Sequence, residues 1–342
     1  MRNDTRKQFE AYSAKVAQLN GVANAEKSFA VAPSVQQKLE TRIQLSSEFL
    51  SKINVIGVRD LEGEKLGLGV IGTIAGRTKT SPSKKRQPRS MADFTSGKYR
   101  CEKTDFDTAI PYAQLDQWAK FPEFQTKLRD VIIKQQALDR IMIGFNGSSA
   151  ADETNRDTNP LLQDVNKGWL QQYRDNAPAR VMKEVKAASG KVMIGKEVAK
   201  ADGYKNLDAL VFDATQSLIH EVFAEHPDLV VIVGRDLLAD KYFPILNKDN
   251  PPTEQMAADL VISQKRIGGL PAVRAPFMPA GKMLITTLSN LSLYYQEDAR
   301  RRHVREEPDY NQIANYESSN DAYVVECYEA GCLIENITLV DA

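Results

Sequence analysis

The sequence predicts an α+β protein that includes extensions too thin to bury a core of their own. Apolar residues recur at helical spacing near the N-terminus and over 121–145, strand-like stretches enclose a polar segment at 78–97, and helices alternate with strands from residue 206. Thin extensions obtain their apolar contacts only from neighbours. This combination indicates a subunit that associates with copies of itself.

Composition limits the class of protein. Of the 342 residues, 42% are hydrophobic and 26% charged, as in an ordinary globular protein. Lys plus Arg and Asp plus Glu both number 45, so the chain lacks the global positive field typical of nucleic-acid-binding proteins. We find no signal-peptide core and no apolar run of about 18 residues, so we expect no membrane segment and synthesis in the cytosol. An odd number of cysteines without metal-ligand spacing predicts free thiols at Cys101, Cys327 and Cys332.

Residues 1–52 carry two weakly amphipathic helical patterns. The small-residue stretch AVAPS at 30–34 separates them. Neither pattern has enough apolar surface to fold alone, so each helix must lie on another surface. We interpret this segment as an arm.

Residues 53–118 change to strand character. Two strand-like stretches flank the segment 78–97, which is rich in Pro, Ser, Lys and Arg. This pattern predicts a long hairpin with a solvated tip, too thin to own a core.

The clearest helix is predicted over 121–145, where apolar residues recur at spacings of three and four. It would be roughly 35 Å long. From Asn206, which can cap a helix, a compact α/β region follows, with a buried strand at 229–233 and a further helix over 254–263. The C-terminal part closes with strands.

Gly67, Gly69 and Gly72 match the spacing of the dinucleotide-binding fingerprint. That fingerprint needs a helix N-terminus directly after the glycines, and β-branched residues, Gly76 and Pro82 follow instead. The side chains from Leu66 alternate as in a strand, so we interpret the glycines as thinning a ribbon and expect no cofactor.

Histidines and basic residues give no catalytic set. His220 is followed by His226 six positions on, about 120° around a helix, so we expect both on a helix surface without a metal. The basic run at 300–305 is followed at once by two glutamates, which leaves nucleic-acid contact, ion pairing with a neighbouring subunit and simple solvation open. The same alternatives apply to the basic residues at the hairpin tip. The residues concerned are Arg300, Arg301, Arg302 and Arg305, and at the tip Lys84, Lys85 and Arg86.

Several long stretches resemble one protein family. They include GEKLGLGVIGTIA, FNGSSAADETNRDTNPLLQDVNKGWLQQYR, PDLVVIVGRDLLADKYFPILNK and NYESSNDAYVVECYEAGCLIE. The chain resembles the major capsid proteins of tailed phages of the P2-like (Peduovirus) group over nearly its whole length. The resemblance implies the Hong Kong 97 (HK-97) capsid fold. Its parts would be an N-terminal arm at 1–52, an extended E-loop at 53–118, a P-domain at 119–205 with a spine helix at 121–145, an A-domain at 206–312, and returning strands at 313–342.

The resemblance also implies a function and partners. Copies of the chain would form pentamers and hexamers of an icosahedral head shell in the virion, assembled in the host cytoplasm. A scaffolding protein would direct a procapsid, and a protease would trim the N-terminus to remove about residues 1–31. Further partners would be the portal protein, head-completion or decoration proteins, and packaged double-stranded DNA held by non-specific contact.

The resemblance gives the candidate residues their roles. We expect cleavage in the small-residue break at Phe29, Ala30, Val31 and Ala32, because an extended segment between two helices is accessible to a protease. E-loop contacts between subunits would involve Gly67, Gly69, Gly72, Lys84, Lys85 and Arg86. No catalytic, cofactor-binding or metal-ligating residues are expected. The alternatives are an encapsulin-type nanocompartment shell and a nucleotide-binding cytosolic enzyme.

Overall fold

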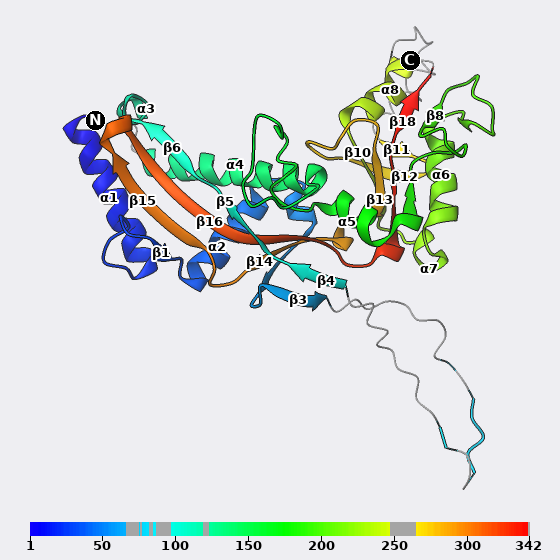
Figure 1. Ribbon diagram of the computed structural model, residues 1–342, viewed down its shortest axis with the longest axis horizontal. Coiled ribbons are helices and arrows are strands. Elements are labelled where there is room, and N and C mark those ends of the chain that lie inside the picture. Colours follow the sequence, from blue (N-terminus) through cyan, green and yellow to red (C-terminus); the bar gives the residue numbers. More distant parts are fainter. Residues whose placement is uncertain are drawn as a thin grey trace, which may run out of the picture.

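The computed structural model describes residues 1–65, 75, 77–81, 85–86, 97–118, 123–246 and 265–340. Two sheets occupy the two ends of an elongated body, and the N-terminal helix α1 lies at the end opposite to the last strand, β18 (Figure 1). Mixed helices and strands confirm the predicted α+β class. Within the described residues, no helix has the length and apolar character needed to cross a membrane.

A seven-stranded sheet forms the end that carries the N-terminus. Its order is β1-β15-β16-β14-β2, and β5 and β6 also pair with β16, so the longest strand is its centre. Most strands are antiparallel, whereas β2 and β14 run parallel. The bounds are β1 Phe29–Ala30, β2 Asn54–Val58, β5 Glu102–Asp105, β6 Thr108–Pro111, β14 Leu291–Gln296, β15 Arg301–Glu307 and β16 Gln312–Val325.

Five helices pack around this sheet, and an aromatic cluster forms the core beneath them. Trp169 is fully buried, and its ring centroid lies 5.3 Å from those of Phe145 and Tyr323 and 6.1 Å from that of Phe49. The long helix predicted over 121–145 is observed from residue 124 to residue 146, while residues 119–122 lie outside the described part. The helices are α1 Asn3–Asn20, α2 Pro33–Leu45, α3 Tyr112–Trp118, α4 Phe124–Asn146 and α5 Trp169–Asn176, with the 3-10 turn η1 Leu50–Lys52 after α2.

A six-stranded sheet forms the other end, in the order β11-β12-β10-β13-β17-β7. Every residue of the central strand β10 is buried, as its unbroken apolar run predicts. Asn206 caps α6 as expected, because its Oδ1 accepts a hydrogen bond of 2.8 Å from the Ala209 amide. The helix predicted over 254–263 lies outside the described residues. The bounds are β7 Val181–Met182, β10 Leu229–Val233, β11 Arg266–Ile267, β12 Leu270–Arg274, β13 Met283–Thr287, β17 Gly331–Ile334, α6 Leu207–Leu218, α7 Glu221–Ala224 and α8 Arg235–Leu246.

Short elements complete the end that carries the six-stranded sheet. A three-stranded sheet, β18-β8-β9, lies beside it. Further 3-10 turns interrupt the chain between strands. These elements are β8 Val192–Ile194, β9 Gly203–Tyr204, β18 Ile337–Leu339, η2 Pro178–Arg180, η3 Leu288–Asn290 and η5 Tyr328–Ala330. The turn η4 Pro308–Tyr310 instead connects β15 and β16 of the seven-stranded sheet.

Asn290 fastens the two ends of the body together. It sits in η3, where the chain passes from β13 to β14. Its side-chain amide donates 2.8 Å to the Cys327 carbonyl, and its Oδ1 accepts 2.7 Å from the Cys327 amide. Cys327 lies where the chain returns from β16 to β17. One buried amide therefore links two of the connections between the sheets through a pair of hydrogen bonds to the same backbone residue.

The hairpin is narrower than the predicted range 53–118. Its described part consists of β3 (Glu62–Lys65) and β4 (Gly97–Arg100), which pair only with each other. In contrast, β2, β5 and β6 belong to the seven-stranded sheet. The physical reason is that the outer parts of the range bury apolar side chains in the body, including Ile53, Cys101 and Phe106.

Replacing Gly144 in α4 by alanine should destabilise the protein. Alanine normally stabilises a helix interior by about 1 kcal/mol over glycine. Here its Cβ would lie 2.2 Å from Cζ3 of Trp169, whose ring is enclosed by other rings. We expect Gly144→Ala to lower the free energy of unfolding by about 1–3 kcal/mol in chemical denaturation of the unassembled protein. Lys134→Ala, at an exposed position of the same helix, is the control and should change it by less than about 0.5 kcal/mol. A stabilising Gly144→Ala would show that this packing is wrong.

Candidate functional site

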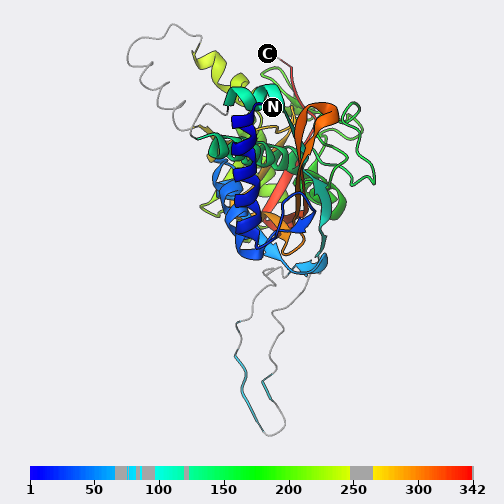
Figure 2. The ribbon, with the colours of Figure 1, turned by 90° about the vertical axis from the view of Figure 1, so that its left-hand side faces the viewer.

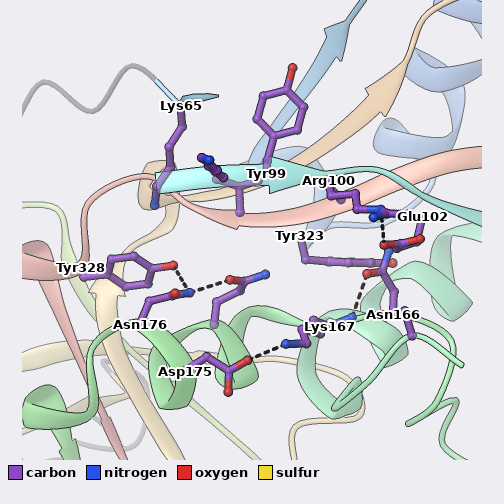
Figure 3. Close-up of a pocket in the computed structure, with 15 residues that line it drawn as sticks. Lys65, Tyr99, Arg100, Glu102, Asn166, Lys167, Asp175, Asn176, Tyr323 and Tyr328 are labelled. Atoms are coloured by element: carbon purple, nitrogen blue, oxygen red, sulfur yellow. Dashed lines mark hydrogen bonds and ion pairs between the residues drawn. The ribbon is translucent and has the colours of Figure 1, made fainter. Parts of the chain in front are cut away.

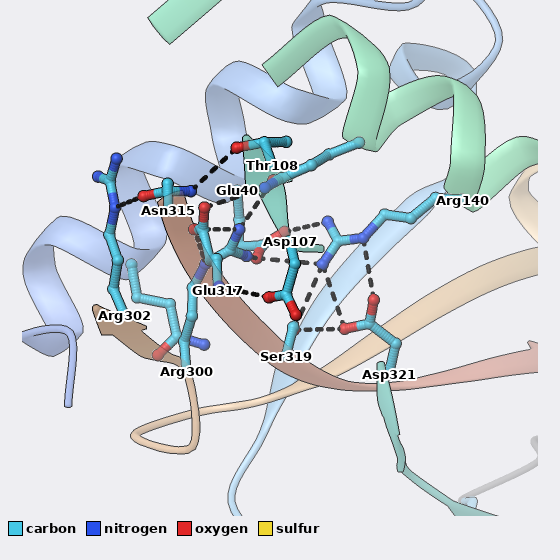
Figure 4. Close-up of polar contacts among 12 residues, drawn as sticks. Glu40, Asp107, Thr108, Arg140, Arg300, Arg302, Asn315, Glu317, Ser319 and Asp321 are labelled. Atoms are coloured by element: carbon cyan, nitrogen blue, oxygen red, sulfur yellow. Dashed lines mark hydrogen bonds and ion pairs between the residues drawn. The ribbon is translucent and has the colours of Figure 1, made fainter. Parts of the chain in front are cut away.

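A buried ionic cluster joins the arm, the long helix and the seven-stranded sheet (Figure 4). Arg140 of α4 donates to both oxygens of Asp321 in β16, at 2.9 and 3.1 Å, and also to Glu40 of α2. Arg300, just before β15, donates to the same Glu40 and, at 2.8 Å, to Glu317 of β16. Segments up to 281 residues apart in the chain thus meet at one point, since 321 minus 40 is 281.

The cluster is closed to solvent and fully hydrogen-bonded. The side chains of Arg140, Arg300, Glu40, Glu317 and Asp321 are all at most 3% exposed. Neutral partners complete it: the Gln136 amide donates 3.0 Å to Glu317 and accepts from Arg300, and the Ser319 hydroxyl donates 2.6 Å to Asp321. Ion pairs buried to this degree are retained only with such complete pairing, because an isolated buried charge costs several kcal/mol.

The arginines of the cluster keep the carboxylates of Glu40 and Glu317 ionised. Burial alone would raise the pKa of Glu40, but the charges of Arg140 and Arg300 outweigh burial and lower it. Burial alone would also raise the pKa of Glu317. The charges of Arg300 and Arg302 and the hydrogen bonds from Arg300 and Gln136 outweigh this effect and lower the pKa to about 2. The pKa of Arg140 is raised, because its carboxylate partners overcome the effect of burial. Glu40, Glu317 and Arg140 are therefore charged near neutral pH.

The predicted basic cluster at 300–305 is split by strand alternation, which sends alternate side chains to opposite faces. Arg300 is fully buried, so the expectation that it faces a neighbouring subunit or DNA is wrong. Arg302, on the same face, donates 2.8 Å to Asn315 and 2.7 Å to the hydroxyl of Tyr12 in α1.

Arg301 and Arg305 point the other way and are exposed. Arg305 pairs with Glu307 at 2.7 Å. Contact of these two residues with another subunit or with DNA stays a prediction.

The expected cleavage segment is not an open loop. Phe29 and Ala30 form β1, which pairs with Arg302 and Arg301 at the edge of the sheet. Phe29 and Val31 are buried, and the Val31 amide donates 2.9 Å to the Arg300 carbonyl. The expectation of an accessible segment is therefore wrong for this conformation, because the extended backbone satisfies its hydrogen bonds on β15.

A single lysine fastens the hairpin base to the body (Figure 3). Lys65, at the end of β3, is buried; its Nζ donates to the Val325 carbonyl and lies 4.2 Å from the ring centroid of Tyr328. Gly97 opposite leaves the space, because a Cβ there would lie 1.9 Å from Lys65 Cε. Burial lowers the pKa of Lys65, while the nearby acidic groups, Glu326 first, oppose the shift.

A polar cavity of about 480 Å³ lies between the hairpin base and α5. The Tyr323 hydroxyl is buried there without a hydrogen-bond partner among the described residues. Several other lining side chains pair with each other, as Lys167 does with Asp175 and Asn176 with Tyr328 (Figure 3). The cavity therefore separates the hairpin from the body without a converging set of reactive groups.

The other predicted E-loop residues are only partly described. Gly67, Gly69, Gly72 and Lys84 lie outside the described residues. Lys85 and Arg86 are described and exposed. Their contacts with a neighbouring subunit stay a prediction.

The two histidines do not share a helix surface as expected. The helix α7 spans only Glu221–Ala224, so His220 precedes it and His226 follows it. Each ring accepts a hydrogen bond through Nδ1 from the amide two residues on, at 3.4 and 3.2 Å. Both rings therefore serve local turns. In the part of the chain that the structure describes, no group of three or more His, Cys, Asp or Glu side chains converges to hold a metal ion.

Four of the five charged residues of the cluster were not predicted from the sequence, and the fifth, Arg300, was expected on the surface. Glu40 and Arg140 lie on the apolar stripes of their helices, next to Ile43 and beside Ala137 and Ile141. A charge on a buried face was the only signal available in the sequence. It did not reveal which charge on another segment neutralises it.

Comparisons with known proteins agree over the whole chain. Residues 8–337 match a family model described as phage major capsid protein, P2 family. A relative named "Capsid proteins" from Escherichia phage P2 is 51% identical, covering 100% of this chain and 96% of the relative. The "Major capsid protein" of Serratia phage KSP20 is 44% identical, covering 99% and 98%.

A solved structure gives the same relationship. A chain of the satellite phage P4 procapsid, which includes the size determination (Sid) protein, superposes with a TM-score of 0.83 at 48% identity. The match covers 100% of this chain and 99% of the other. This superposition confirms the capsid fold that the resemblance implied.

Replacing one arginine of the cluster should lower the free energy of unfolding far more than replacing a surface arginine. Arg140→Met leaves Glu40 and Asp321 buried with less compensation, so we expect a loss of about 3–5 kcal/mol in the free energy of unfolding. Arg129→Met, in the same helix, removes an arginine that is 41% exposed and pairs with Asp130. It should cost less than about 1 kcal/mol in the same denaturation assay. Equal effects of the two substitutions would contradict the role given to the cluster.

Acid should weaken the protein through the same cluster. The folded pKa of Glu317, about 2, lies below the ordinary value of 4.5, so its stabilisation is complete above about pH 4.5 and is lost as pH falls toward 2. The pKa of Glu40 is also lowered in the folded protein. We expect the free energy of unfolding to fall by more than about 1 kcal/mol between pH 5 and pH 3. Glu317→Gln should flatten this dependence, and an unchanged slope would count against the assignment.

Proposed function

The chain belongs to the P2 family of phage major capsid proteins, and from this premise we propose how its parts act in a head shell. The supporting observation is the match to the P4 procapsid chain over the full length of the chain. We propose that copies of the protein form the pentamers and hexamers of an icosahedral shell in the virion, enclosing double-stranded DNA without base-specific contacts.

We assign the parts of the subunit by sheet membership. The seven-stranded sheet with α4 is proposed as the P-domain and its spine helix, and the six-stranded sheet with α6 and α8 as the A-domain. The strands β14 and β15 then belong to the P-domain, although the sequence placed them within 206–312. The hairpin that starts at β3 and β4 is the proposed E-loop, and α1, β1 and α2 form the arm.

The proposed activity is physical and involves no catalysis. Copies would bury exposed apolar side chains against one another, and many weak contacts repeated around a closed shell would hold it together. Phe212 of α6 is 64% exposed and Val222 of α7 51%, so the A-domain offers one such surface. Tyr310, 74% exposed at the turn between β15 and β16, offers another at the far end of the P-domain.

We propose a scaffold-directed assembly in the host cytoplasm, followed by cleavage near Phe29 to Ala32. Because β1 is paired and partly buried, the protease must act on a conformation in which β1 has left β15. The portal protein and head-completion or decoration proteins are proposed as further partners. No observation favours the encapsulin shell or the nucleotide-binding enzyme over this proposal.

The direct test is electron microscopy of the full-length protein expressed with and without the scaffolding protein of its phage. Closed shells of uniform size with the scaffold support the proposal. Soluble monomers under both conditions would refute it. Intact-mass measurement of mature particles tests the cleavage: a chain that still carries residue 1 would end that part.

Releasing the hairpin base should reduce assembly more than folding. Lys65→Ala removes the buried hydrogen bond to Val325 and the contact with Tyr328, which together fix the base of the E-loop. We expect the yield of closed shells to fall about tenfold or more, because a net loss of about 1–2 kcal/mol at this contact is repeated in every subunit of the shell. The unfolding midpoint of the single subunit should change little. Lys98→Ala, an exposed lysine on the paired strand β4, is the matched control. If both variants assemble equally well, Lys65 has no such role.

A further inference from the structure

Helix α1 covers an apolar surface on the body of its own subunit, and we call this surface the groove. It runs along the end of the seven-stranded sheet beside α3 (Figure 2). Phe9 is buried against Leu115 of α3, Val304 of β15 and Ile313 of β16. These three body residues are at most 5% exposed with α1 in place. The groove therefore has an apolar floor that α1 covers.

Polar contacts set the position of α1 in this groove. At its first turn, Asp116 of α3 accepts 3.0 Å from the Arg2 amide and 2.6 Å from the Thr5 hydroxyl. One turn on, Arg6 pairs with Glu306 of β15 at 3.2 Å. The body thus places two carboxylates beside the first two turns of α1, and these contacts set the position of the N-terminal end of the helix.

A second apolar cluster holds the other end of the same segment. Val16 and Ala17 of α1 pack with Ala25, Phe29 and Val31. The Ala25 carbonyl accepts a hydrogen bond of 3.0 Å from the Val304 amide, so this turn is attached to the sheet as well.

The following helix, α2, touches the α1 cluster through Val35 and has a further anchor in the body that involves no residue of α1. Glu40 of α2 belongs to the buried ionic cluster, which includes no residue of the segment 1–31. Between α1 and α2, the described side-chain hydrogen bond runs from the Ala32 amide to Asn20. A cut between the two helices would therefore leave the contacts of both with the body in place.

We propose that the N-terminal segment stays bound in the groove after the chain is cut ahead of α2, as a non-covalent peptide of the same subunit. Its loss would expose Leu115, Val304 and Ile313 together with the edge of β15, and the cut itself removes none of the contacts that cover them. The occurrence of such a cut in the phage rests on the proposed function. Retention in the groove is a property of this fold and is testable without the phage protease.

The test uses the full-length chain with a recognition sequence for a site-specific protease inserted between Glu26 and Lys27, both exposed. After complete cleavage, native size-exclusion chromatography shows whether the fragment from α1 elutes with the body. Co-elution that is lost in denaturant supports the proposal. A fragment that elutes separately overturns it, whether the remaining body stays soluble or precipitates.

Two aspartate substitutions in α1 separate groove binding from unspecific adhesion. Val16→Asp places a carboxylate at a position 6% exposed and should speed dissociation of the cut fragment at least about tenfold. Leu19→Asp makes the same kind of change three residues away, where the side chain is 56% exposed, and should leave retention unchanged. Equal retention of the two fragments would overturn the assigned contacts.

Mature particles supply the test in the phage. Washed, cleaved shells should contain peptides from residues 1–31 in near-equal amount to the remaining chain when they are dissolved and analysed by mass spectrometry. Absence of cleavage would refute the proposed maturation step alone. Cleavage with loss of the peptide would refute retention alone.

Discussion

The buried charges of Glu40, Arg140, Arg300, Glu317 and Asp321 are the constraint on which the body of this subunit depends. They can be taken out of water only together, because each arginine compensates carboxylates from two different segments. Any arrangement that moved α2, α4 or β16 separately would leave a charge unpaired in the interior. The cluster therefore specifies one relative position of the arm helix, the long helix and the central strand.

Other parts of the subunit are held in a different way. The hairpin base depends on Lys65, and α1 depends on two small apolar clusters and partly exposed polar contacts. The side chains that make these attachments are not members of the ionic cluster. In the proposed shell this division would let the body repeat in every position while the extensions make the contacts with neighbouring subunits. The cleavage proposed between α1 and α2 falls at the boundary between the two kinds of attachment.

Local patterns in the sequence predicted those elements that local physics decides. The long helix followed from its apolar spacing, the cap at Asn206 from its side chain, and the strand at 229–233 from its unbroken apolar run. Pairing between distant segments was not predictable in this way. Residues 53–118 looked like one hairpin because their strands' partners, β14 and β16, lie about 200 residues away in the chain. Arg300 looked like a surface charge because nothing in the local sequence indicates that it pairs with Glu40 and Glu317. The function was predicted from the resemblance to capsid proteins and not from individual residues.

Native-state hydrogen exchange measures the proposed division most directly, because it reports the free energy of opening segment by segment. The amides of α2, α4 and the middle of β16 should open together, with one common free energy that falls when Arg140 is replaced. The amides of α1 and of β3 and β4 should open at lower free energy and respond little to that replacement. If α2 exchanged as readily as α1, with α4 still protected, the ionic cluster would not be what holds the arm to the body.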